Sequence, residues 1–202
     1  MANRDKIENI PIVVLAAGAA SRMRGADKLT ALIDGEPLLR IVVGRAASVG
    51  PVHVALHHNA QARRATLDGL AVTVLQTPNA ADGLSGTMRD AIAQLPACPA
   101  FMIILADMPD ITGADMQSLI DARNTRPDAL TWRGATAEGL PGHPILCDAS
   151  LRPKFAHLTG DSGGSEIMKT FTDQTVLVRF SDDRARLDLD TPEAWAAWRA
   201  AR

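Results

Sequence analysis

The sequence predicts an α/β protein, in which one mostly parallel sheet lies between two layers of helices within a single domain over residues 1–202. Short apolar, β-branched runs recur along the first half of the chain, and segments with helical character separate them. These runs are so uniformly apolar that strands buried on both faces are expected. A length of 202 residues suits one such domain.

The four apolar runs are predicted to be strands, at residues 10–15, 52–56, 72–75 and 101–105. Helices are predicted between and after them, several beginning at a capping residue or an early proline; they start at Pro37, Asn59, Ser85 and Thr112. Right-handed crossovers between parallel strands place a ligand crevice at the carboxyl ends of the strands.

The alternation of predicted strands and helices becomes less regular after Arg126. Three segments read as strands, ALTWRG, PILCD and TVLVRF, and two read as helices, SEIMKTF and TPEAWAAWRAAR. We expect this part to extend the same sheet as an α+β region without a linker.

Composition excludes several classes of function. The formal net charge of -2 provides no general basic field for nucleic acid or anionic lipid, and an aromatic content of 3% leaves no base-stacking surface. The apolar runs are too short to span a bilayer, and the polar start MANRDKIENI lacks a signal-peptide pattern, so a cytoplasmic location is expected. Cys98 and Cys147 lack zinc or redox spacing and are predicted to be buried thiols.

The segment LAAGAASRMRGADK, residues 15–28, follows the first predicted strand. It contains neither GxxxxGK[ST] nor GxGxxG, which excludes a standard P-loop and a dinucleotide fingerprint. Gly18 and its small neighbours can expose backbone N–H groups to phosphate oxygens, while Arg22 and Lys28 add positive charge. A phosphate site and a plain glycine turn with solvated cations both fit these residues.

Carboxylates follow two distant segments. Asp107 follows the apolar run at 101–105. Asp188 and Asp190, in LDLD, are predicted to lie at a second strand end and to share one face of it. Two carboxylates reaching one crevice suit Mg²⁺, although spacing does not choose between Asp188 and Asp190. Asp107 could instead cap a turn, and Asp190 could cap the helix beginning near Pro192.

A second segment that is a candidate for binding a ligand begins at Thr77. Asn79 and Gly83 suit a loop that approaches a base. The helix that opens at Ser85, Gly86 and Thr87 can point N–H groups at phosphate or base edges. A capped helix without a ligand is the alternative. None of the five histidines has HExxH spacing, and each is expected to be structural or at the surface, His143 least so.

Residues 15–28 also resemble the signature LAxGxSxRMGxxxK of nucleotidyltransferases that join a nucleoside triphosphate to a phosphorylated acceptor. Among these, the chain is most similar to the molybdenum cofactor nucleotidyltransferases, MobA-like NTP transferases, and within them to the cytidylyltransferase branch. Arg24 departs from the pattern, because a glycine usually follows the methionine. Four further segments resemble the family in order: TPNAADGLSGTMRDAI, LADMPDIT, GLPGHPILCD with LTGDSGG, and LDLDTPEAW.

The resemblance implies a Rossmann-like sheet of the nucleotidyltransferase type and transfer of CMP from CTP to molybdopterin with release of pyrophosphate. It implies catalytic roles for Lys28 and Arg22 and a Mg²⁺ site at Asp107 and Asp190. The nucleotide-binding residues it implies are Leu15, Ala16, Ala17, Gly18, Ser21, Arg22, Lys28, Thr77, Asn79, Gly83 and Ser85. The acceptor-binding residues it implies are Gly142, His143, Pro144, Gly160 and Asp161.

Three alternatives remain at the level of sequence. A guanylyltransferase, or a transferase acting on a sugar or alditol phosphate, would use the same type of site. A non-catalytic carrier would bind the molybdenum cofactor and pass it to a recipient molybdoenzyme, which is also a possible partner of the enzyme. A nicotinamide-dependent oxidoreductase is disfavoured because the dinucleotide fingerprint is missing.

Overall fold

The computed structural model describes residues 10–18, 23, 26–160 and 164–202. Its centre is a seven-stranded sheet with the order β5-β4-β1-β6-β8-β7-β9. In that order the strands are β5 (Val72–Gln76), β4 (Val52–Leu56), β1 (Ile12–Leu15), β6 (Ala100–Leu105), β8 (Pro141–Asp148), β7 (Thr131–Ala135) and β9 (Thr175–Arg179). A two-stranded ribbon, β2 (Leu32–Ile33) with β3 (Glu36–Pro37), lies outside this sheet.

The predicted mostly parallel sheet is confirmed. Strands β5, β4, β1 and β6 are all parallel, and β9 is parallel to β7. The exception is β8, which runs antiparallel to both β6 and β7. A short connection joins β7 directly to β8, so the chain reverses as a hairpin and needs no helical crossover there.

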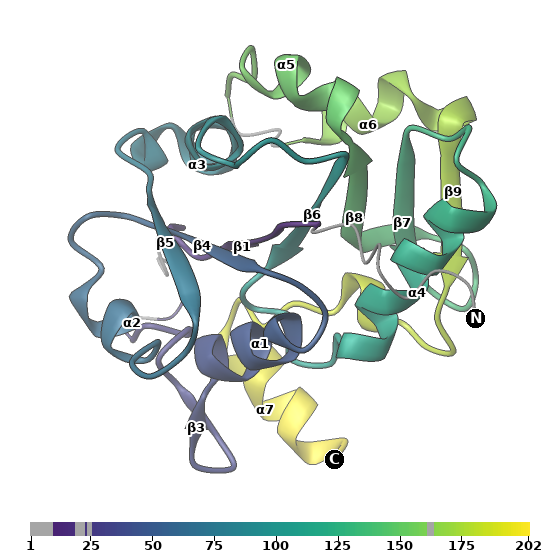
Figure 1. Ribbon diagram of the computed structural model, residues 1–202. Helices are drawn as coiled ribbons and strands as arrows, with labels where there is room; N and C mark the ends of the chain where they lie inside the picture. The colour runs from purple at the N-terminus through teal and green to yellow at the C-terminus, as the bar shows by residue number, and fades with distance from the viewer. Residues whose placement is uncertain (1–9, 19–22, 24–25, 161–163) are drawn as a thin grey trace, which may run out of the picture.

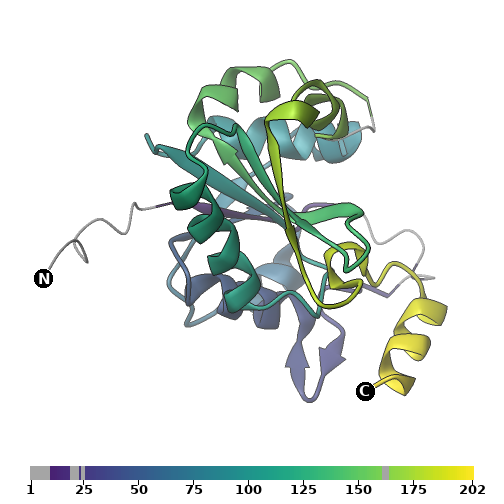
Figure 2. The ribbon, with the colours of Figure 1, turned by 90° about the vertical axis from the view of Figure 1, so that its right-hand side faces the viewer.

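Helices cover both faces of the sheet (Figure 1). One face carries α1 (Leu38–Ala47), α2 (Gln61–Ala65), α4 (Gly113–Thr125) and α7 (Pro192–Ala200). The other face carries α3 (Gly83–Ala93), α5 (Arg152–Phe155) and α6 (Ser165–Thr170). Single turns of 3₁₀ helix complete the fold: η2 (Ala80–Asp82), η3 (Ala149–Leu151), η4 (Thr172–Gln174) and η5 (Arg184–Arg186). The turned view in Figure 2 shows the same two helical layers with the sheet between them.

Alternate side chains of the central strands enter two separate cores. In β1, Ile12 and Val14 join the core beneath α1 and α4, whereas Val13 and Leu15 join the core beneath α3. Because both faces of the strand are fully covered, the uniformly apolar sequence of β1 is explained. The polar site therefore begins where the strand ends.

Three expectations about local structure need correction. Helix α3 begins at Gly83 and not at Ser85, because η2 leads directly into it. Asp188 and Asp190 lie in an extended segment and not in a strand, although the Leu189 amide donates a hydrogen bond to the Asp107 carbonyl at 3.0 Å. Cys98 is half-buried, while Cys147 is buried as expected.

Within the described parts of the chain, no helix is both long and apolar enough to cross a membrane.

Candidate active site

A pocket of about 440 Å³, here called the large pocket, opens at the carboxyl ends of β1 and β6. Residues 15–18 continue β1 along one wall, and residues 105–107 end β6 along another. The remaining wall comes from η2, the first turn of α3 and the extended segment at 188–190. The lining residues are Leu15, Ala16, Ala17, Gly18, Lys28, Leu29, Ala80, Ala81, Gly83, Leu84, Thr87, Leu105, Ala106, Asp107, Asp188 and Asp190.

Lys28 connects the two acidic segments at this pocket. Its Nζ donates a hydrogen bond to Asp107 Oδ2 at 2.5 Å and another to Asp190 Oδ1. Burial alone would lower the pKa of Lys28, but the charges and hydrogen bonds of Asp107 and Asp190 outweigh burial and raise this pKa above its ordinary value. Three segments far apart in the sequence thus meet at one ammonium group.

The acidic residues form a compact set. One carboxylate oxygen from each of Asp107, Asp188 and Asp190 lies within 4.8 Å of the others. Leu189 between them is buried, so Asp188 and Asp190 share the opposite side of the extended segment, as the period of two predicts. Burial, together with the charges of Asp190 and Asp107, raises the pKa of Asp188.

This acidic set fits a divalent cation. Asp107 Oδ1 is buried and accepts no hydrogen bond from the residues that the structure describes, which leaves a lone pair directed at no donor. Hard cations such as Mg²⁺ prefer carboxylate oxygens, and a cation here would offset the mutual repulsion of the three aspartates. Asp107, Asp188 and Asp190 are therefore all candidate ligands.

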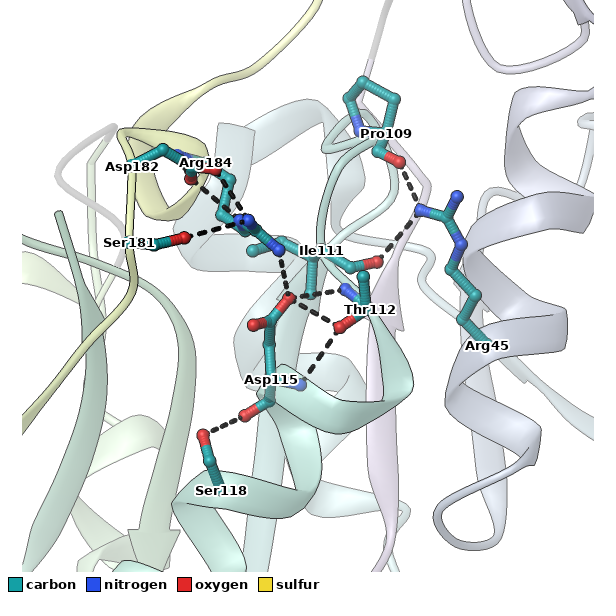
Figure 3. Close-up of polar contacts among 9 residues, drawn as sticks. All are labelled: Arg45, Pro109, Ile111, Thr112, Asp115, Ser118, Ser181, Asp182 and Arg184. Carbon is teal, nitrogen blue, oxygen red and sulfur yellow. Dashed lines mark hydrogen bonds and ion pairs between the residues drawn. The ribbon is translucent and has the colours of Figure 1, made fainter. Parts of the chain in front are cut away.

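Polar contacts join the segments that follow Asp107 and precede Asp188 (Figure 3). Thr112 and Asp115 form a capping box at the start of α4, and the Asp115 carboxylate also faces Arg184 Nη1 at 3.4 Å. Arg45 reaches across from α1 and donates to the carbonyls of Pro109 and Ile111, at 3.0 Å for Ile111. These contacts link the loop after Asp107 to the η5 turn that precedes Asp188.

Arg63 stabilises the wall of the large pocket that residues 15–18 form. The side chain is buried, and its Nη1 donates to the carbonyls of Ala16 at 2.6 Å and Gly18 at 2.8 Å. Its Nε donates to Asp27 Oδ2 at 2.7 Å. Arg63 thereby ties the end of β1 to the residue before Lys28. No motif in the sequence marks it, because its partners lie on remote parts of the chain.

The segment beginning at Thr77 contributes differently from the prediction. Gly83 lines the large pocket, but Thr77, Asn79 and Ser85 do not. Thr77 is fully buried, the Asn79 amide donates to Asp90 Oδ1 at 2.8 Å, and the Ser85 hydroxyl donates to the Thr159 carbonyl at 3.3 Å.

Sequence reasoning missed the lining residues Ala80, Ala81 and Leu84, whereas Thr87, which it placed at the opening of this helix, does line the large pocket. Gly83 and Thr87 lie four residues apart on the same face of α3. This spacing explains why both residues line the large pocket.

Only some of the predicted acceptor residues line a pocket near the acidic set. Gly142 and His143 line a second pocket of about 270 Å³, here called the small pocket, which shares Leu105 and Asp188 with the large one. Pro144 is buried in β8, and Gly160 lines none of the described pockets that meet at Asp188. A Cβ on Gly142 would lie 1.9 Å from the Ala185 carbonyl oxygen, so close packing against η5 requires glycine there.

His143 is held neutral in the wall of the small pocket. Burial first, and then the charge of Arg133, lowers the pKa of His143 to about 4. Its Nδ1 is buried and has no hydrogen-bond partner among the described residues.

Three predicted site residues, Ser21, Arg22 and Asp161, lie outside the described residues, as does Arg24. Their roles stay predictions.

Several known proteins are similar to this chain in sequence. Residues 12–176 match the model of the family described as MobA-like NTP transferase domain. Nicotine blue oxidoreductase of Paenarthrobacter nicotinovorans is 28% identical over 192 residues, which cover 90% of this chain and 92% of that protein. The bifunctional protein GlmU of Kineococcus radiotolerans is 32% identical over 128 residues, but this match covers 59% of this chain and 26% of the relative.

Solved structures share the fold. A Mycobacterium tuberculosis Rv0371c homologue from Mycobacterium sp. strain JC1 superposes with a TM-score of 0.82 at 23% identity, covering 96% of both chains. A CMP:2-keto-3-deoxy-manno-octonic acid synthetase complexed with CTP superposes with a TM-score of 0.71 at 15% identity, covering 95% of this chain and 98% of the other.

Proposed function

The chain belongs to the MobA-like NTP transferase family, and we propose that it transfers the CMP moiety of CTP to molybdopterin with release of pyrophosphate. Nucleotidyl transfer is supported by the family and by the fold. The observation that carries the proposal is the meeting of Lys28 with Asp107 and Asp190 at the large pocket. Cationic and anionic groups in contact at a strand end suit a polyphosphate bound with a metal ion.

In the proposed reaction, a phosphate oxygen of the acceptor attacks the α-phosphorus of CTP. The bond from the α-phosphorus to the bridging oxygen breaks in line, and pyrophosphate leaves with the bond electrons. The attacking phosphate is already largely ionised near neutral pH, since its second pKa is about 6, so the chain need not supply a general base. His143, whose pKa is about 4, is neutral at pH 7 and is not required as one.

The chain's own residues act by positioning and by charge. Backbone N–H groups near Gly18 donate to phosphate oxygens, and the Lys28 ammonium neutralises negative charge near the reacting centre. Asp107, Asp188 and Asp190 would hold Mg²⁺, which when bound supplies further charge neutralisation to the triphosphate. We retain Arg22 as a predicted contact of the leaving pyrophosphate.

The choice of CTP rests on similarity. The sequence Leu15-Ala16-Ala17-Gly18 resembles the cytidylyl branch, and one of the proteins with the same fold is complexed with CTP. Guanylyl transfer, or transfer to a sugar or alditol phosphate, remains the alternative within the same chemistry.

Pyrophosphate release tests the proposal. Purified protein with Mg²⁺ and molybdenum-loaded molybdopterin is assayed in parallel with CTP, GTP, ATP and UTP. We expect release with CTP only, reduced about 100-fold or more in Lys28→Ala and Asp107→Asn, because each removes a charge near the reacting phosphates. Lys154→Ala, which removes an exposed lysine from α5, is the matched control and should retain activity.

Other outcomes identify other functions. Release with GTP would assign the guanylyl branch. If no nucleotide gives pyrophosphate release, a different acceptor or the carrier function is favoured. For a carrier, Lys28→Ala should leave transfer of the cofactor to a molybdoenzyme intact.

A second candidate function follows from one relative. Nicotine blue oxidoreductase matches along nearly its whole length, so an oxidoreductase activity deserves a direct assay. The segment after β1 has no GxGxxG, which counts against a dinucleotide site of the usual type. The assay supplies nicotine blue, the compound in the relative's name, as the electron acceptor. Oxidation of a reduced nicotinamide cofactor coupled to two-electron reduction of nicotine blue, undiminished in Lys28→Ala, would support this alternative over nucleotidyl transfer.

A further inference from the structure

The small pocket brings two guanidinium groups together. Arg133 comes from β7 and Arg186 from η5, and both line the pocket beside Gly142 and His143. Arg133 donates only long hydrogen bonds to the Gly142 carbonyl, at 3.2 Å from Nη2 and 3.4 Å from Nε. Within the described parts of the chain, neither arginine forms an ion pair with a carboxylate, so most of their N–H donors are available to a ligand.

The position of Arg133 makes this arrangement costly without a ligand. Its neighbour Trp132 points into the opposite core, which directs Arg133 to the face with the small pocket. Burial first, and also the nearby charge of Arg186, lowers the pKa of Arg133. An arginine nevertheless stays ionised, so the partly desolvated charge of Arg133 shares one pocket with the exposed charge of Arg186. An anion is the ligand that would relieve both effects.

The small pocket adjoins the large one. Leu105 and Asp188 line both, so a molecule in the small pocket can reach the acidic set at the end of β6. Asp188 is the carboxylate at this shared edge, and Arg133 and Arg186 lie beyond it on the side of the small pocket. A negatively charged group in the small pocket therefore has two cations, as well as Asp188, among the residues that surround it.

We propose that Arg133 and Arg186 form an anion site that binds the phosphomonoester group of the acceptor. This inference rests on the proposed nucleotidyl transfer, and it assigns the phosphate of the acceptor to two residues that lie outside the predicted acceptor segments. Guanidinium groups can bind two phosphate oxygens at once, which leaves a third oxygen to reach the nucleotide in the large pocket.

Binding of inorganic phosphate, measured by titration calorimetry, tests the site without any turnover. We expect Arg186→Gln and Arg133→Gln each to weaken binding about ten-fold or more, because each removes charge-assisted hydrogen bonds. Arg179→Gln removes an exposed arginine that lines none of the described pockets and should bind as the wild type does. Lys28→Met separates the two pockets: a loss of phosphate binding in Lys28→Met alone would assign the anion to the large pocket and overturn the proposal.

Folding of the variants is controlled within the same set. Arg186 is exposed, so Arg186→Gln should leave the thermal midpoint unchanged. Arg133→Lys keeps the charge of the half-buried side chain but loses the planar guanidinium group. We therefore expect its phosphate affinity to lie between those of Arg133→Gln and the wild type. Full affinity in Arg186→Gln would contradict the proposed pair.

Kinetics then tests the link to the acceptor. With active wild-type protein, we expect the KM for molybdopterin to rise about ten-fold or more in Arg186→Gln, with the KM for CTP unchanged. An unchanged KM for the acceptor would overturn the assignment. A wild type that is inactive with every nucleotide would count against the proposed function alone, since the phosphate titration still decides whether the anion site exists.

Discussion

Arg63 illustrates how a single buried side chain can organise a loop at a distance. Its guanidinium satisfies the carbonyls of Ala16 and Gly18 and pairs with Asp27, so both flanks of the predicted phosphate-binding segment depend on it. A buried charge is stable only when it is fully hydrogen-bonded, and here the required partners are the backbone of the large pocket itself. The residue therefore has a positioning role and does not face the pocket.

Substitution Arg63→Lys tests this role. Lysine keeps the charge but cannot reach three acceptors with a fixed fork, so we expect about ten-fold weaker binding of CTP, which corresponds to about 1.4 kcal/mol. The free energy of unfolding should fall by about 2 kcal/mol, because hydrogen bonds to a charged group are lost. Titration calorimetry and urea unfolding measure the two effects.

The neighbouring arginine provides the control. Arg64 lies on the same short helix but is exposed, so Arg64→Lys should match the wild type in both measurements. Equal CTP affinity in Arg63→Lys and the wild type would remove the positioning role.

At the scale of elements, the first turn of α3 is fixed by close backbone packing. A Cβ on Gly86 would lie 2.0 Å from the Asn79 carbonyl oxygen and 2.9 Å from Asp82 Cβ. The absence of a side chain lets η2 fold against α3, which brings Ala80 and Ala81 to the same pocket as Gly83. The helix and the preceding turn thus form one wall.

Two helical glycines should respond in opposite directions to alanine. Gly86→Ala should lower the free energy of unfolding by about 3 kcal/mol, because the backbone atoms of η2 must move. Gly44→Ala, at an exposed position of α1 with open space around it, should raise that free energy by about 0.5–1 kcal/mol, since alanine favours the helix. Urea unfolding of both variants checks the pair, and a stabilising Gly86→Ala would contradict the packing.

The bounds of some elements can be predicted from the sequence, whereas the direction or start of others cannot. The strand at 52–56 was predicted with its observed bounds because an apolar run between turn residues is a local signal. The antiparallel direction of β8 and the start of α3 depend on neighbours distant in the chain, and local patterns do not contain them.

The same distinction applies to the site. The sequence points to Lys28 because it ends the segment at 15–28, and to Asp107 and Asp190 because they were expected at strand ends. The structure brings all three together. Arg63, Arg133 and Arg186 come from an ordinary helix, strand and turn. Arg63 acts on carbonyls at the end of β1, whereas Arg133 and Arg186 meet only because the fold brings β7 and η5 to one pocket with the end of β6. No spacing rule in the sequence could have selected them.

At the scale of the whole molecule, the buried His53 and the half-buried His143 link stability to pH. Burial lowers the pKa of His53, and burial with the charge of Arg133 lowers the pKa of His143 to about 4. In the unfolded chain both histidines titrate near 6.5. Between these values the unfolded state binds more protons than the native state, so the free energy of unfolding falls as the pH falls from about 6.5 towards about 4. Asp188 acts in the opposite sense, because its pKa is raised.

Urea unfolding at about pH 7 and about pH 5 measures this linkage. For His143 alone we expect a loss of about 2 kcal/mol at the lower pH, since its unfolded form is then protonated and its native form is not. His143→Gln cannot titrate and should lose most of this pH dependence, whereas His58→Gln, at an exposed position, should keep it. An equal fall in stability for His143→Gln and the wild type would mean that the native His143 accepts a proton as readily as the unfolded one, and that the wall of the small pocket is open to water.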